Sequence, residues 1–135
     1  MRKFLFAACL GLALLAGLAS DASLAQPAQC GRVANGASAA ATTLVITGTA
    51  GQGIHLCGWD VTATAVGTWQ IITGTGATCG TGTVNISAAH SLGAQNALSS
   101  SGATPGRYSA PQGNNICVIV TGTGPVQWTI YYTQF

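Results

Sequence analysis

Short runs of β-branched and aromatic residues, each ended by turn-forming residues, make up the chain from Thr42 onward. The runs are TTLVITGT, GIHLCGWDVTATAV, GTWQIITG, GTVNISA, NNICVIVTG and PVQWTIYYTQF. Many short strands with frequent turn signals are typical of an all-β sandwich or barrel. No segment after Ala25 has the apolar spacing of a helix. The sequence therefore predicts one small all-β domain, a β-sandwich, with the jelly roll as the candidate arrangement.

The last run shows the most regular alternation of side chains. One series is Val126, Trp128, Ile130 and Tyr132, and the other is Gln127, Thr129, Tyr131 and Thr133. Successive side chains of a strand point to opposite faces of its sheet. We therefore expect Trp128 and Ile130 in the core and Thr129 on the opposite face.

The first 25 residues have the parts of a secretory signal peptide. Met1-Arg2-Lys3 is basic, residues 4–19 are almost wholly apolar, and Ser23-Leu24-Ala25 ends a stretch of small residues. This pattern predicts cleavage before Gln26, with a cut after Ala22 as the alternative. The apolar run is too short to span a bilayer, so no membrane span is expected after the signal is removed. A secreted or periplasmic protein is predicted, with residues 26–41 as a flexible leader and 42–135 as the β-sandwich domain.

Four cysteines remain after the predicted cleavage. An even number of cysteines in a small exported domain predicts two disulfides, with three pairings that spacing alone does not separate. The cysteines are Cys30, Cys57, Cys79 and Cys117. A zinc site with His55 or His90 is the alternative, but structural zinc sites take ligands in close pairs and these cysteines are far apart. No metal ion or cofactor is therefore predicted.

The mature chain carries very little charge. Its charged side chains are Arg32, Asp60 and Arg107. Without a basic patch, binding to nucleic acid or to anionic lipid is disfavoured. Proteins of near-zero net charge tend to associate. We expect self-association or attachment to a cell-surface or virion component, with a neutral monomer as the alternative.

The Gly/Thr-rich stretch around Cys79 raises the question of phosphate binding. Gly74, Gly76 and Gly80 miss the dinucleotide spacing, and the mature chain has no Lys for a P-loop. A disulfide-stapled turn between strands is the better interpretation.

Catalytic residues are not predicted, and the chain is expected not to be an enzyme. Glycoside hydrolysis usually needs two carboxylates, and the mature chain has only one carboxylate side chain. The chain also has no Gly-x-Ser-x-Gly elbow for a serine nucleophile. Asp60 is interpreted as a turn former, His55 as a half-exposed strand residue and His90 as a loop residue.

Two alternative functions remain open. A small carbohydrate- or ligand-binding module would use exposed aromatic residues, and Trp59, Tyr108 and Tyr131 are the candidates. An outer-membrane-associated, barrel-like protein is suggested by the terminal aromatic Phe135. However, the strand face that carries Phe135 is too polar for contact with lipid.

Four segments together resemble a known group of proteins. They are Ile54-His-Leu-Cys57-Gly58, Gly74-Thr-Gly-Ala-Thr-Cys79-Gly-Thr-Gly-Thr83, Asn115-Ile-Cys117-Val and Tyr132-Thr-Gln-Phe135. The pattern, over residues 42–135, is similar to small, mostly uncharacterised, Gly/Thr-rich, disulfide-containing β-sandwich proteins of bacteria and tailed phages. The resemblance implies a non-enzymatic structural or surface-attachment module. Phage structural proteins usually lack an export signal, so a secreted bacterial or prophage-derived relative fits this chain better.

The resemblance also implies a disulfide pairing. In this group the site that corresponds to Thr78-Cys79-Gly80 and the Ile-Cys-Val site occur together, which favours Cys79 with Cys117. Cys30 is then left to pair with Cys57.

Overall fold

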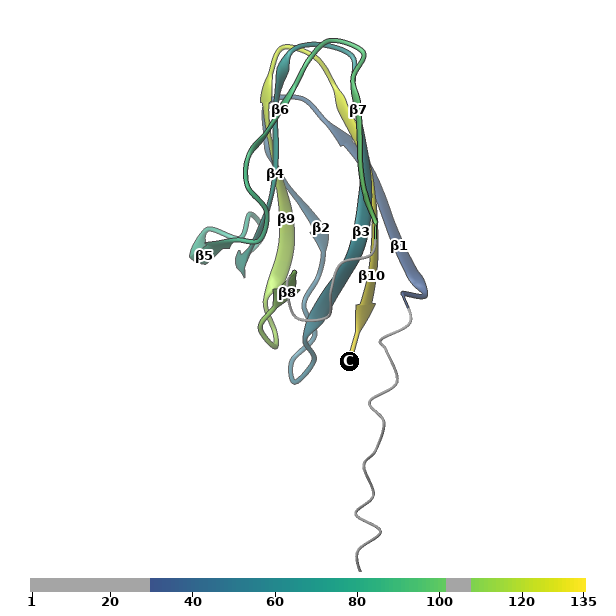
Figure 1. Ribbon diagram of the computed structural model, residues 1–135. Helices are drawn as coiled ribbons and strands as arrows, with labels where there is room; N and C mark the ends of the chain where they lie inside the picture. Colours follow the sequence, from purple (N-terminus) through teal and green to yellow (C-terminus); the bar gives the residue numbers. More distant parts are fainter. Residues whose placement is uncertain (1–29, 102–107) are drawn as a thin grey trace, which may run out of the picture.

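The computed structural model describes residues 30–101 and 108–135, which form two antiparallel β-sheets packed face to face (Figure 1). The predicted signal peptide and the first residues of the predicted leader lie outside the described residues. Within the described ranges, the structure has no helix of the length and apolar character needed to cross a membrane. The predicted all-β sandwich is confirmed.

Sheet A contains the two ends of the described chain. Its strands lie in the order β1 (Arg32–Ser38), β10 (Val126–Gln134), β3 (Ile54–Ala63) and β7 (Ala97–Ser101). The two-residue β8 (Ser109–Ala110) pairs with the first residues of β3, whereas β7 pairs with later ones. All of these pairs are antiparallel.

Sheet B faces sheet A across the core. Its order is β2 (Thr42–Ile46), β9 (Asn115–Gly122), β4 (Gly67–Thr75) and β5 (Thr81–Asn85). The short β6 (His90–Leu92) pairs with the first residues of β4, whereas β5 pairs with the last ones. β5 curls away from the body of the sandwich (Figure 1).

The order of the strands identifies a jelly roll. The chain changes sheets at most connections and stays in one sheet only from β4 to β6 and from β7 to β8. When β5 with β6 and β7 with β8 are each taken as one interrupted strand, two sheets of four strands result. Their orders, 1-10-3-7/8 and 2-9-4-5/6, are those of the eight-stranded double Greek key.

The core lies between the sheets and is built by side-chain alternation. In β10, Val126, Trp128 and Ile130 are buried and Gln127 is exposed, as the sequence predicted. The indole ring of Trp128 packs over Gly36 of β1. A Cβ atom added to Gly36 would lie 2.7 Å from Cζ2 of that ring. Because Gly36 has no side chain, β1 can pair with β10 while the indole ring lies against it.

A β-bulge in the middle of β3 changes which residues face the core. Opposite β10, Tyr131 pairs with Gly58 but Tyr132 pairs with Leu56, so Cys57 is an extra residue. Leu56 faces the core before the bulge, and Trp59 faces it afterwards, only 4% exposed. Trp59 is therefore a core residue and not an exposed binding aromatic.

The predicted flexible leader 26–41 needs correction, because it contains β1. β1 and β7 are rich in Ala, Ser and Gly and have little apolar alternation. They are held by backbone pairing with β10 and β3, respectively, which a search for apolar periodicity does not detect.

Candidate functional site

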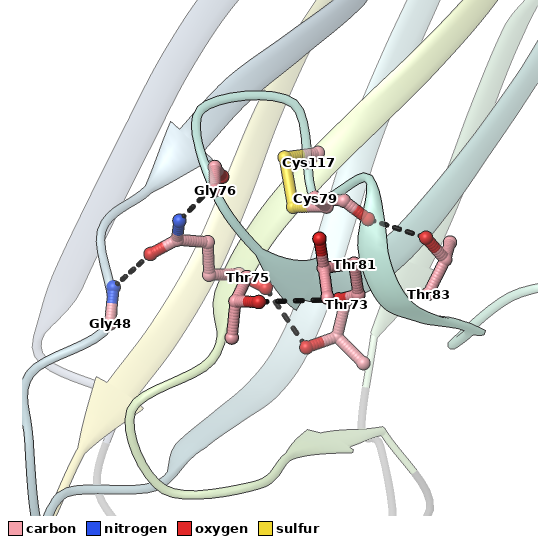
Figure 2. The surroundings of a disulfide bond; sticks show 9 residues. Gly48, Thr73, Thr75, Gly76, Cys79, Thr81, Thr83 and Cys117 are labelled. Carbon is pink, nitrogen blue, oxygen red and sulfur yellow. Dashed lines mark hydrogen bonds between the residues drawn. A yellow bond between two sulfur atoms is a disulfide. The ribbon is translucent and has the colours of Figure 1, made fainter.

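The Cys79–Cys117 disulfide fastens the turn between β4 and β5 to the outer face of sheet B (Figure 2). The two Cα atoms are 6.1 Å apart, and both cysteines are fully buried beside Ile72. The second bridge joins Cys30 to Cys57, with 6.2 Å between their Cα atoms. The pairing that the resemblance implied is confirmed.

Hydrogen bonds hold the stapled turn in one shape. Asn115 accepts from the backbone N–H of Gly48 at 2.8 Å and donates to the carbonyl of Gly76 at 2.9 Å. The hydroxyl of Thr83 donates to the carbonyl of Cys79, as Figure 2 shows. Cys79 has a φ of 53°, a conformation that L residues rarely adopt. The Gly/Thr stretch is thus a disulfide-stapled turn between strands.

The two histidines lie in different environments from those that the sequence suggested. His55 is 5% exposed, and its Nδ1 lies 3.1 Å from the hydroxyl oxygen of Ser109. His90 lies in β6, with its ring centroid 5.9 Å from that of Trp69. Asp60 lies within β3 and not in a turn, and it accepts a hydrogen bond from Tyr131. Among the described residues, no three His, Cys, Asp or Glu side chains gather closely enough to hold a metal ion.

The outer face of sheet A brings together polar side chains from three strands, and Asp60 is the charged one among them. Antiparallel register places Asn35, Thr129 and Asp60 in one row and Gln127 beside Thr62 in the next. Tyr131 lies in a third row, opposite Val33. We call the set the sheet A face, made of Asn35, Asp60, Thr62, Gln127, Thr129 and Tyr131.

The sheet A face is open and shallow. Five of its residues line a depression of about 240 Å³, and all six are exposed except the half-buried Thr129. From standard strand spacings, the three rows cover about 10 Å across the strands and about 14 Å along them. Within the described ranges, the side chains of Asn35, Thr62, Gln127 and Thr129 form no hydrogen bond. Their polar groups are available to a ligand.

Asp60 and Tyr131 form the one hydrogen-bonded pair of this face. The Tyr131 hydroxyl donates to Oδ2 of Asp60 at 3.0 Å. This hydrogen bond and the negative charge of the carboxylate raise the pKa of the Tyr131 phenol above its ordinary value. The bond orients an aromatic ring that is 37% exposed. Tyr131 is therefore a neutral, positioned aromatic side chain at one end of the face.

The sequence identified only part of this face. Tyr131 was a candidate, and the alternation of the last run indicated its outward direction. The third candidate, Tyr108, is half-buried and packs edge-on against Trp59, with ring centroids 5.1 Å apart. Asn35 was missed because it fell in the predicted leader. Only the strand register could have aligned Asn35 with Thr129 and Asp60.

Part of the outer face of sheet B is covered by the protein itself. The stapled turn covers Ile72 and Cys117. Gln70 donates to the carbonyl of Ser87 at 3.1 Å, and the hydroxyls of Thr68 and Thr121 are 2.7 Å apart. These polar groups are used internally, unlike those of the sheet A face.

Comparisons with protein families, with curated proteins and with solved structures found no match for this chain.

Proposed function

We propose that this protein is an exported, non-enzymatic attachment module that binds a cell or particle surface through the sheet A face. The observation that carries the proposal is the set of polar side chains on this face that the fold leaves without partners. The strands β1, β10 and β3, which carry these side chains, pair with one another in sheet A. This pairing fixes the spacing of the side chains, which reduces the entropy lost on binding.

Two disulfides support a location outside the cytoplasm, because thiols are kept reduced in the cytosol. The signal-like residues 1–25 support the same location. Secretion or release into the periplasm would then deliver the module to a surface.

The test is co-sedimentation of the purified mature protein with cell envelopes of the producing organism. Thr62→Arg places a long charged side chain on the sheet A face and should weaken sedimentation by at least about tenfold. Thr81→Arg in β5 is the matched control, since Thr81 is also an exposed strand threonine but belongs to sheet B. It should sediment like the unmodified protein.

Two results would contradict the proposal. One is an unmodified protein that stays in the supernatant, and the other is a Thr62→Arg variant that sediments as well as Thr81→Arg does. Circular dichroism of both variants checks that each is folded.

A second candidate function, assembly of copies of the chain, is favoured by β5. All five residues of β5 are exposed, Val84 is 58% exposed, and the strand carries no charge. Natural edge strands usually carry charges or prolines that prevent pairing with another chain. Light scattering should then show a mass that rises with concentration and returns to that of a monomer in Val84→Lys. A constant monomer mass excludes this candidate.

A further inference from the structure

We propose that the ligand of the sheet A face is a neutral glycan, bound along an extended stretch of sugar units. This inference rests on the attachment role proposed above and adds the chemical class of the surface component. Charge, hydrogen-bonding groups, the Tyr131 ring and the shape of the face each support it.

Charge argues against an ionic ligand. In the described ranges, Arg32 and Asp60 are the charged side chains, and only Asp60 belongs to the sheet A face. Arg32 points to the other side of β1 from Val33, and its Nη1 donates to Gln134 at 3.1 Å. Among the described residues, an anionic ligand would find no cation on the face, and the single carboxylate already accepts the Tyr131 hydroxyl. The face therefore suits an uncharged ligand.

The hydrogen-bonding groups suit a ligand rich in hydroxyls. Asn35 and Gln127 each offer amide donors and an acceptor, and the hydroxyls of Thr62 and Thr129 can do either. Asp60 retains acceptor capacity beyond its bond to Tyr131. Sugar hydroxyls both donate and accept, so these mixed groups can pair with them from either side. A largely apolar partner would instead leave the amides without hydrogen bonds, at a cost of about 1–3 kcal/mol for each buried group.

The ring of Tyr131 supplies the apolar part of the contact. A sugar ring has C–H groups on its faces, and these pack on the face of an aromatic side chain. The bond to Asp60 fixes the Tyr131 hydroxyl, and Val33 lies opposite in the register with 53% of its surface exposed. Tyr131 can therefore receive one sugar unit while the polar rows bind the next ones.

The openness of the face favours a chain over a single sugar. Enclosed small-molecule sites are generally larger cavities that bury most of the ligand, whereas this depression of about 240 Å³ is shallow. An open face can contact several consecutive sugar units, and a polysaccharide presents many equivalent sites to each module. A surface glycan is such a repeating target.

The experiment uses three preparations of the same cell envelopes. One is untreated, one is treated with periodate to oxidise the vicinal diols of sugars, and one is treated with protease. Mature protein should sediment with the untreated and protease-treated envelopes and lose sedimentation by about tenfold or more on the periodate-treated ones. Soluble mannan, galactan and glucan are then added as competitors, and at least one should release the protein. Polygalacturonate, an anionic glycan, should not.

Variants of Tyr131 connect this binding to the sheet A face. Tyr131→Ala should weaken sedimentation about tenfold, because an exposed aromatic anchor is lost. Tyr131→Phe keeps the ring and should lose less than about threefold. Phe135→Ala removes an aromatic ring that is 66% exposed but lies outside the face, and it should have no effect.

The outcomes separate this inference from the proposed attachment role. Loss of binding on protease-treated envelopes, with full binding after periodate, would replace the glycan by a protein partner and overturn the inference. The attachment role would survive that result if Thr62→Arg still weakened binding by about tenfold or more. Equal binding by Tyr131→Ala and the unmodified protein would also overturn the inference.

Discussion

Removal of the Cys79–Cys117 bridge should cost a large share of the protein's stability. The bridge closes 38 positions of chain, and the loop-entropy relation assigns such a closure about 4 kcal/mol. Two smaller effects nearly cancel. Partial exposure of Ile72 under the released turn costs about 1 kcal/mol, and relaxation of Cys79 from its φ of 53° returns about 1 kcal/mol. Cys79→Ala with Cys117→Ala should therefore lose about 4 kcal/mol, a large share of the stability of a small domain.

Urea denaturation without reductant, followed by tryptophan fluorescence, measures this loss. Cys30→Ala with Cys57→Ala is the matched control. The bridge that it removes closes 27 positions of chain, so the expected loss of stability is about 3.5 kcal/mol, and the turn over Ile72 stays in place. Hydrogen exchange should be faster in the turn 76–80 of the first variant only. A loss below about 1 kcal/mol in the first variant, or a turn that exchanges equally in both variants, would refute this reasoning.

Three further predictions follow from the fold and the sheet A face. Trp128→Ala should lower the free energy of unfolding by about 3–5 kcal/mol and Thr129→Ala by less than about 1 kcal/mol, as measured by urea titration. Similar small losses in both variants would mean that the faces of β10 are misassigned. Asp60→Asn should lower the pKa of Tyr131 towards its ordinary value, because it removes the carboxylate whose hydrogen bond and negative charge raise that pKa. Ultraviolet titration against Tyr131→Phe measures this, and an unchanged pKa would contradict the pairing. Fractionation of the native host should find a chain that begins near Gln26 outside the cytoplasm, and an intact cytoplasmic Met1 species would contradict export.

The sequence predicted the fold class well because apolar alternation marks buried strands. The run at residues 126–132 indicated the buried Trp128 and Ile130 directly. Alternation failed at the β3 bulge, since the extra residue Cys57 turns Trp59 inward. A bulge depends on how two strands pair, and neither strand alone reveals it.

The candidate site was less predictable than the core. Tyr131 was identified from its own strand, but Asn35 and Asp60 join it through the register of β1, β10 and β3. Register is set by long-range pairing over more than 70 positions of sequence, as in the Tyr131–Asp60 hydrogen bond with its separation of 71. Polar face residues carry little local signal, because a solvated strand face also contains Thr, Asn and Gln.

Hydroxyl-radical footprinting of the envelope-bound protein tests most directly whether the sheet A face is the attachment surface. Tyr131 on this face and Leu44 on sheet B have nearly equal exposed fractions, 37% and 38%, which makes Leu44 a fair reference. The labelling rate of each residue is compared between the bound and the free protein. Binding through the sheet A face should reduce labelling of Tyr131 several-fold and leave that of Leu44 unchanged. Unchanged labelling of Tyr131 in the bound protein would contradict the account.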